Sequence, residues 1–420
     1  MSSMNGEVVA GIDVHKAMLA VVVARPGQNE TEYVSRKSGA GPWQLRELID
    51  WLLELGVTRV AMESTAQYWK PVWYALEPFF QLILAQPRST SAPRGRKMDF
   101  ADAKRIVRRL LADDLTVSFV PEAEQRRWRL LTRARTTAMQ QITRLRNQIE
   151  GLLEEGQVKI SGLLSDLLGL SGWRMLQALA KGESDPEVLA KLAHEHVRAS
   201  QEQLREALDG RMDSAHRLLL RQSLDQIEQL RKQAEELDEE ITRLLAAQQA
   251  AIERLCAVPG ISLTAAFQIV AEIGPQAKTF AAPGKLASWA GLCPGREESA
   301  GISVSNRCAR GNRTLKRVLT QCAWAAVRNQ KSQFYRLFQR WRVVLGARKA
   351  IIAVAHRMLI VIWKLLHEGE AYIDAGCQLT PETIRRRMLK CVKGLEALGF
   401  RVVVTPNTPT AGTRRRLSRV

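Results

Sequence analysis

The sequence lacks the cysteine and histidine patterns of disulfide-rich and zinc-binding proteins. Its six cysteines form no CxxC pair, and its six histidines show no spacing typical of metal ligands. These absences argue against structural zinc and favour free thiols in a reducing cytoplasm. The cysteines are Cys256, Cys293, Cys308, Cys322, Cys377 and Cys391.

Long apolar runs are also missing. No segment reaches the roughly 18 consecutive apolar residues of a membrane span, and the N-terminus lacks the charged-then-apolar pattern of a signal peptide. Even the apolar segment 350–366 is interrupted by His356 and Arg357. We therefore expect no membrane partner, and a core helix over residues 348–369.

Acidic residues are scarce in the last third of the 420-residue chain. Residues 285–420 hold 26 Lys/Arg and 7 Asp/Glu, a net charge of +19, whereas residues 1–284 hold 36 of each kind. A basic excess gathered in one part of a chain predicts a polyanionic partner, either nucleic acid or an acidic membrane surface.

Short β-branched runs and amphipathic segments follow one another through the first 90 residues. Their order is strand, strand, strand, helix, strand, helix, strand, which suggests an RNase H-like α/β fold. The expected elements are residues 7–14, 17–24, 31–37, 41–56, 57–64, 65–78 and 79–87.

Four carboxylates in this region are candidates for a site. Asp13 lies inside the first strand and Glu63 ends the fourth, and an unpaired carboxylate is costly to bury there. If these strands are parallel neighbours, both carboxylates point into one crevice at the strands' carboxyl ends. Asp99 and Asp102 share one face of an expected helix that could close over that crevice. Such a cluster predicts divalent cations, and a pair of magnesium ions fits the oxygen ligands.

These carboxylates also have structural alternatives. Asp99 fits the N-cap of its helix, Asp102 fits a first-turn partner of the helix dipole, and Asp13 fits a turn. Nearby cations at Arg94, Arg96 and Lys97 are expected to contact nucleic acid.

Apolar residues recur at alternating spacings of three and four over residues 121–155 and 213–255. This pattern predicts two long helices that pair within one chain or between chains, and hence a coiled-coil arm and oligomerisation. Residues 156–212 are expected to be helical and carry no chemical motif.

Residues 255–274 are two apolar helical segments joined at Pro259-Gly260. They resemble a helix-hairpin-helix element, in which N–H groups of the turn around Gly260 meet a DNA phosphate. A plain αα-hairpin is the alternative.

Ser299 lies in a stretch rich in glycine and proline, followed by a helix that opens at "GNRTLKR". A hydroxyl among arginines and beside a helix N-terminus suits a nucleophile that attacks a phosphodiester. An ordinary loop serine is the alternative. The cations expected to bind nucleic acid here are Arg296, Arg307, Arg310, Arg313, Lys316 and Arg317.

Several stretches together resemble the DEDD transposases of the insertion sequence 110 family, a group that includes the pilin-gene invertases. The order and spacing of these stretches carry the resemblance, which covers roughly residues 7–375. They are "GIDVHK", "AMESTAQYW", "KMDFADA", "VPGISLTAAFQIVAEIG", "WAGLCPGREESAG" and "RGNRTLKRVLTQCAWAA".

The resemblance implies a bacterial, cytoplasmic and nucleoid-associated DNA recombinase of a mobile element. Its N-terminal domain would resemble the RuvC Holliday-junction resolvase, with Asp13, Glu63, Asp99 and Asp102 as a magnesium-binding tetrad. Ser299 would form a covalent phosphoserine bond to DNA. The implied partners are element-end and target DNA, a structured bridge RNA, and other copies of the chain, as dimers that assemble into a tetramer. In the family the two sites form a composite centre across subunits.

Two alternatives stay open: a resolvase-like endonuclease in which a metal-bound water attacks, and a non-enzymatic nucleic-acid-binding protein. Ser303 and Ser305 lie close enough to Ser299 in sequence to compete for the nucleophile's role. The expected domains are 1–120 (RuvC-like), 121–250 (helical arm), 251–375 (basic, mainly helical transposase domain) and 376–420 (basic extension with a helix at 381–399 and a strand at 400–404).

Overall fold

The computed structural model describes residues 7–27, 30–63, 66–86, 99–294 and 310–374, with the short stretches 297–299, 302–305, 308, 388–389, 392–393, 396 and 401. For Asp99 and for stretches 297–299 and 302–305 it describes the backbone alone. The chain divides into two compact units, Met1–Ala123 and Glu124–Val420. The predicted boundaries near residues 250 and 375 stay predictions.

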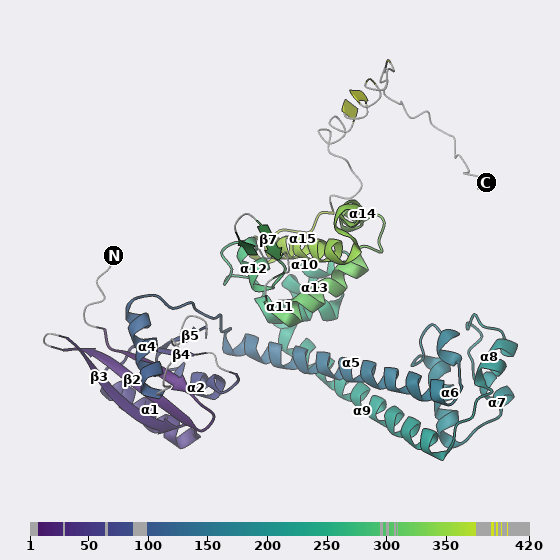
Figure 1. Ribbon diagram of the computed structural model, residues 1–420, viewed down its shortest axis with the longest axis horizontal. Coiled ribbons are helices and arrows are strands. Elements are labelled where there is room, and N and C mark those ends of the chain that lie inside the picture. Colours follow the sequence, from purple (N-terminus) through teal and green to yellow (C-terminus); the bar gives the residue numbers. More distant parts are fainter. Residues whose placement is uncertain are drawn as a thin grey trace. The chain divides into compact units, whose positions relative to one another are not determined.

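The first unit contains one five-stranded sheet in the order β3-β2-β1-β4-β5 (Figure 1). β1 is antiparallel to β2 and parallel to β4, and β4 is parallel to β5. This order, with its single antiparallel meander, confirms the predicted RNase H-like fold. The elements are β1 (Val9–Val14), β2 (Met18–Pro26), β3 (Thr31–Gly39), α1 (Pro42–Glu54), β4 (Arg59–Glu63), α2 (Trp69–Leu76), β5 (Gln81–Ala85) and α4 (Asp99–Leu111).

Helices cover both faces of the sheet. Alternate residues of β1 point to opposite faces, so they belong to different cores. Ala10, Ile12 and Val14 join a core with buried residues of α1 and α2. Val9 belongs to a second, smaller core with buried residues of α4. On the α4 side, a Cβ on Gly11 would lie 2.6 Å from the carbonyl oxygen of Ala103, so glycine permits this close approach.

The second unit begins with a helical arm made of α5 (Ala123–Glu155) and α9 (Ser214–Leu245), which lie side by side in Figure 1. The Arg135 guanidinium donates to both carboxylate oxygens of Asp238, at 2.7 and 3.0 Å, and joins the two helices. The two long helices therefore pair within one chain. Between them η1 (Ile160–Gly162), α6 (Leu170–Lys181), α7 (Pro186–Ala190) and α8 (Gln201–Leu208) pack into a separate core.

One predicted helix differs from the structure. The sequence pattern predicts a continuous helix over 213–255, but a 3-10 turn, η2 (Ala246–Gln248), separates α9 from α10 (Gln249–Cys256). η2 contains no buried residue, whereas Leu245 before it and Ala251, Ile252 and Leu255 of α10 are buried in one core. The helix is therefore interrupted at residues that no core packing holds.

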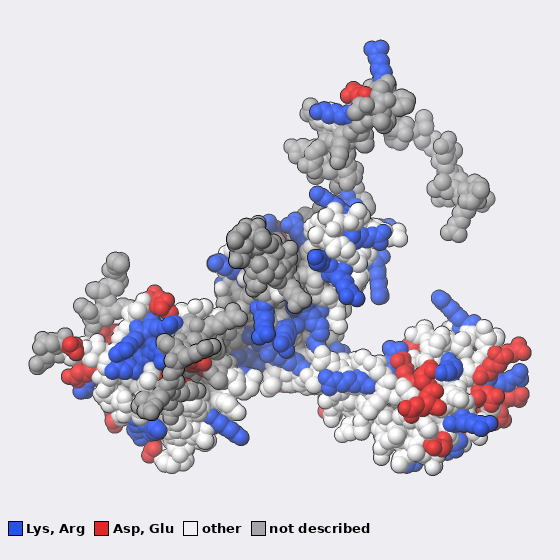
Figure 2. All heavy atoms as spheres, viewed as in Figure 1, with Lys and Arg blue, Asp and Glu red and all other residues white. Residues whose placement is uncertain are grey.

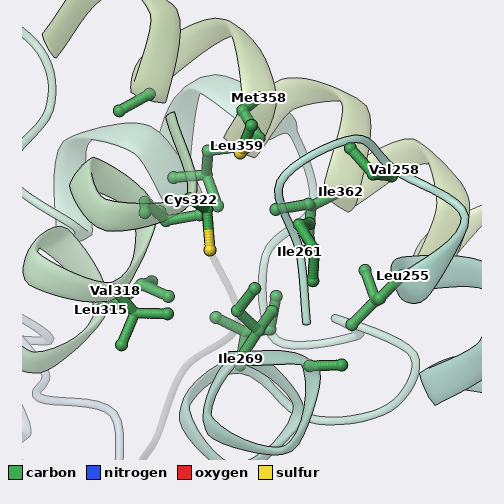
Figure 3. Packing of buried hydrophobic residues seen from close by; sticks show 14 of the residues in the cluster. Leu255, Val258, Ile261, Ile269, Leu315, Val318, Cys322, Met358, Leu359 and Ile362 are labelled. Carbon is green, nitrogen blue, oxygen red and sulfur yellow. The ribbon is translucent and has the colours of Figure 1, made fainter. Parts of the chain in front are cut away.

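The rest of the unit packs around α15 (Ala347–His367), as Figure 3 shows for part of this core. α15 is long and apolar enough to cross a membrane by composition alone, yet ten of its residues are buried against the surrounding helices. It is the predicted core helix. The other elements are α11 (Leu263–Ile273), α12 (Pro283–Trp289), β6 (Glu297–Ser299), β7 (Ile302–Ser305), α13 (Arg313–Ala326) and α14 (Gln333–Leu345).

Candidate functional site

Asp13 and Glu63 lie at the carboxyl ends of neighbouring parallel strands, as the sequence predicts. The last paired residues of β1 and β4 are Ile12 and Met62, and the two carboxylates follow one residue later on each strand. By strand alternation both point to the α4 face of the sheet, together with Gly11 and Ala61. Asp13 is 15% exposed, and its carboxylate lies 3.2 Å from Nε2 of His15.

α4 carries the other two predicted carboxylates. Asp99 is its first residue. Asp102 precedes Ala103, which contacts Gly11, so α4 places it at the same face of the sheet as Asp13. The Arg105 guanidinium donates to Asp102 at 2.7 Å and balances its charge. Arg94, Arg96 and Lys97 lie outside the described residues.

The described carboxylates do not converge on one point. Within the described part of the chain, the carboxylate oxygens of Asp13, Glu63 and Asp102 do not all lie within 4.8 Å of one another. Like charges repel at such distances unless a cation separates them. A pair of hard oxygen donors on adjacent strand ends, with a third on the covering helix, is nevertheless the donor set that a divalent ion of the magnesium type takes.

One group of potential metal ligands was missed from the sequence. His194, Glu195 and His196 have ligand atoms within 4.8 Å of one another. The histidine spacing in the sequence did not indicate this group. All three side chains are exposed, and such a group gives no evidence of an ion by itself.

Ser299 ends β6, one half of a short hairpin. Ser299 pairs with Ile302 on β7, so it is the last paired residue of β6. A serine beside a hairpin turn is carried at the end of the hairpin, away from its base. Ser303 pairs with Glu298 and Ser305 with Glu297, so the two alternative serines lie progressively further from the turn.

The base of this hairpin is held by several contacts to the helices on either side. Pro294 and Cys308 form an isolated antiparallel bridge. The backbone N–H of Asn312 donates to the Trp289 carbonyl at 3.0 Å, and Lys316 Nζ donates to the Gly291 carbonyl at 2.9 Å. These contacts hold the residues before the hairpin close to the residues after it.

Glu272 of α11 is a buried carboxylate that contacts Asn312, next to the base of this hairpin. Its side chain is 1% exposed, and it accepts two hydrogen bonds from Arg133, at 2.8 and 2.9 Å. It also accepts from the side-chain amide of Asn312 at 2.7 Å, and Asn312 in turn caps α13 through the Leu315 N–H.

Arg129 completes this network, 3.5 Å from Glu272. Burial lowers the pKa of Arg129 to about 10, while the carboxylate opposes that change. Arg129 stays charged at neutral pH. The sequence signal for Glu272 was a single carboxylate in the apolar segment "IVAEIG", the same signal that identified Asp13.

The predicted cations of the hairpin region are partly placed. Arg310 and Arg313 are exposed, and Arg317 is half-buried on the first turns of α13, as predicted. The Lys316 ammonium group donates a hydrogen bond to the Gly291 carbonyl. Arg296 and Arg307 lie outside the described residues.

Gly260 has a packing reason to be glycine. It joins α10 and α11 with φ +86°, and an added Cβ would lie 2.4 Å from the Cys322 carbonyl oxygen of α13. The predicted helix pair is present, and contact of its turn with nucleic acid stays a prediction.

Two sequence models of one transposase family match separate parts of the chain. The sequence model described as "Transposase IS116/IS110/IS902 family" matches residues 252–339, and the DEDD model of the same group, described as "Transposase", matches residues 10–157. These features define a transposase with a DEDD nuclease domain. The chain belongs to the IS110 family of transposases. It therefore binds DNA, and its nuclease domain implies a divalent metal ion.

Two Sinorhizobium fredii relatives are similar over most of the chain. "Putative transposase y4pF/y4sB" is 24% identical over 345 residues, 79% of this chain and 79% of that protein. "Putative transposase y4qE" is 26% identical over 353 residues, 79% of this chain and 75% of that protein.

Solved structures of RuvC from Thermus thermophilus are similar over a smaller part. RuvC alone is 15% identical and covers 26% of this chain and 99% of RuvC, with a TM-score of 0.21. RuvC in complex with a Holliday junction substrate is 14% identical and covers 27% and 99%, with a TM-score of 0.20.

Proposed function

We propose that this transposase cuts and rejoins DNA through a covalent bond to Ser299, assisted by a magnesium-binding tetrad and directed by a structured RNA from its element. The observation that carries the proposal is the position of Ser299 at the end of β6, beside the turn of a hairpin whose base is fixed to the N-terminal side of α13. A nucleophile that the fold holds in place suits attack on a DNA strand.

The chemistry conserves the phosphodiester bond energy. The Ser299 hydroxyl loses its proton to a base as its oxygen bonds to phosphorus. The bond from phosphorus to one deoxyribose oxygen breaks, and that oxygen leaves as a hydroxyl. A hydroxyl from the new strand then attacks the phosphoserine and releases the serine, so no water is consumed.

The basic residues of α13 and the tetrad have separate parts in this scheme. Arg313 and Arg317 near the α13 N-terminus stabilise negative charge on the attacked phosphate, with help from the helix dipole. Asp13, Glu63, Asp99 and Asp102 would hold magnesium. When bound, the metal supplies Lewis-acid stabilisation and orients a DNA strand.

The net charge of +19 in residues 285–420 supports a polyanionic partner large enough for both DNA and a guide RNA. Oligomerisation through the arm, as dimers that form a tetramer in the bacterial cytoplasm, would bring several serines and tetrads to one pair of DNA duplexes.

The first prediction concerns Ser299→Ala. Purified protein, magnesium, supercoiled DNA carrying the element ends and RNA transcribed from the flanks are incubated, denatured and separated on a gel. We expect wild type to yield protein covalently attached to DNA and Ser299→Ala to yield none. DNA binding should be unchanged, because a single hydroxyl contributes little to a contact dominated by phosphates.

Ser303→Ala, on the partner strand of the same hairpin, is the matched control and should keep the adduct. Asp13→Asn should lose the adduct while binding DNA. DNA cleavage without an adduct, unchanged in Ser299→Ala, would instead establish the metal-activated-water endonuclease. DNA binding that needs neither Ser299 nor Asp13, with no strand cut, would establish a binding protein.

A further inference from the structure

An apolar tip stands out from the second unit where α14 meets α15. Val343 and Val344 are 82% and 83% exposed, and Leu345 is 43% exposed. Val and Leu are usually buried, so three in a row at a helix end are costly to leave in water. We refer to residues 340–349, which include this triplet, as the α14–α15 tip.

The tip is rigidly built. α14 is anchored at its start by Phe334 and Phe338, which are buried, and Phe338 packs edge-on against Trp324 with ring centroids 5.7 Å apart. On the other side of the tip, Ala350 of α15 is fully buried. The exposed tip is therefore bounded by buried residues on both sides, Phe338 of α14 and Ala350 of α15.

Gly346 makes the reversal between the two helices possible. Its φ is +74°, a conformation that favours glycine, and its N–H donates to the Arg342 carbonyl at 3.0 Å. The Ala350 N–H in turn donates to the Gly346 carbonyl at 3.0 Å. Because both backbone hydrogen bonds are made, the apolar triplet is presented in a defined position.

Cations surround the triplet. Arg340, Arg342, Arg348 and Lys349 are all exposed, and no ion pair of the described residues involves any of them. The sequence contains no Asp or Glu between Glu298 and Glu368, a stretch with 14 Lys/Arg. In Figure 2 the visible surface over α14 is white and blue, without red.

This combination selects one kind of partner. A second copy of the same tip would place like charges face to face, which opposes self-association. A polyanion satisfies the cations, and the chain is a transposase, which binds DNA. Proteins that bend duplex DNA insert apolar side chains between base pairs of the minor groove and hold the flanking phosphates with Arg and Lys.

We propose that the α14–α15 tip is a DNA wedge. Leu345 and Val344 enter a base step from the minor groove and unstack it, while Arg340, Arg342, Arg348 and Lys349 bind the phosphates on either side. The distorted step lowers the cost of opening the duplex before its strands are exchanged. This role rests on DNA binding and not on the identity of the nucleophile.

Permanganate footprinting tests the wedge, because permanganate oxidises thymines that have lost their stacking. Protein, flanking RNA and linear duplexes of the element ends are combined in EDTA, so that cleavage does not contribute. We expect wild type to create hyper-reactive thymines at one or two steps and to bend the duplex, as measured by fluorescence transfer between its ends. The variant Val343→Ser, Val344→Ser, Leu345→Ser should lose both signals and keep DNA affinity within a few-fold.

Two further variants make the result specific. Leu130→Ser removes an exposed leucine of α5, 69% exposed, and should behave as wild type. Arg340→Gln with Arg348→Gln should weaken binding and reduce the slope of log K against log salt by about 2, as expected for two lost phosphate contacts.

Three results would overturn the wedge. One is the absence of hyper-reactive thymines with wild type, and another is an identical footprint from the serine variant. The third is a serine variant that changes only the oligomeric state, or only binding to vesicles of anionic phospholipid. That result would identify the tip as a protein or a membrane contact. Ser299→Ala should leave the footprint unchanged, so failure of the nucleophile assignment is distinguishable from failure of the wedge.

Discussion

Glu272 shows how much a single buried carboxylate can connect. It binds Arg133 and Arg129 of the arm and Asn312 at the start of α13, while only 1% exposed. Two guanidinium groups and an amide compensate the cost of burying this charge. Removing the carboxylate takes away the negative charge that lies 3.5 Å from Arg129, which is itself only 12% exposed.

We therefore predict that Glu272→Ala lowers the free energy of unfolding by about 3 kcal/mol or more, the usual cost of breaking a buried ion pair. Urea denaturation followed by circular dichroism measures it. Glu240→Ala, which removes an exposed partner of Arg243 on α9, is the matched control and should change stability little. Equal stability of the two variants would contradict a structural role for the Glu272 network.

At the scale of elements, Gly260 fixes how the α10–α11 pair meets α13. Its Cα faces the α13 backbone so closely that an added Cβ would lie 2.4 Å from the Cys322 carbonyl oxygen and 2.5 Å from the Ala326 nitrogen. Neither is a flexible side-chain end that can move aside, and φ at +86° adds strain for any other residue.

Gly260→Ala should accordingly destabilise the protein by about 2 kcal/mol, combining overpacking with a left-handed backbone conformation. Thermal unfolding by calorimetry checks this value. Gly284→Ala in α12 is the control, because a Cβ there meets nothing within 4 Å, and alanine favours a helix. If both alanines were neutral, α13 would have to be free to move away from the turn.

The strands and most helices could be predicted from sequence because the spacing of apolar residues is enough to identify each of them. β1 and β4 alternate or run apolar, and α15 carries a continuous apolar face, so local periodicity is enough. The break at η2 could not be predicted, because the residues on both sides favour helix and only tertiary packing separates them.

The same distinction applies to the site. Asp13 and Glu63 were identifiable as charges inside apolar strands, and their strands are parallel neighbours as expected. Glu272 carried the same kind of signal, but its partners Arg129, Arg133 and Asn312 are far away in sequence. Only the fold shows that this carboxylate joins the arm to the helix that follows Ser299.

For the whole molecule, charge is the feature that separates the parts of the chain. Positive and negative residues balance up to residue 284, and the excess of 19 lies beyond it. Such asymmetry predicts that the last third makes most of the contacts with nucleic-acid phosphates.

DNA binding should therefore depend steeply on salt. With six or more phosphates neutralised, affinity falls by roughly 10³ or more between 50 and 200 mM salt. Fluorescence anisotropy of a labelled duplex over that range measures the slope. The Asp13→Asn variant should give the same slope as wild type, because the charges that release counterions lie elsewhere. A flat salt response would mean that the basic third does not contact phosphates.

The arm has a mechanical consequence. α5 has 33 residues, and at 1.5 Å per residue it is roughly 50 Å long. Its first turns are fixed by Arg129 and Arg133 to Glu272, and its far end carries α6, α7 and α8 (Figure 1). A swing of about 5° at the fixed end would carry the far end through roughly 4 Å, by the same helix geometry. The Glu272 carboxylate at that end also holds Asn312, so such a displacement would reach the N-terminus of α13 through this one side chain.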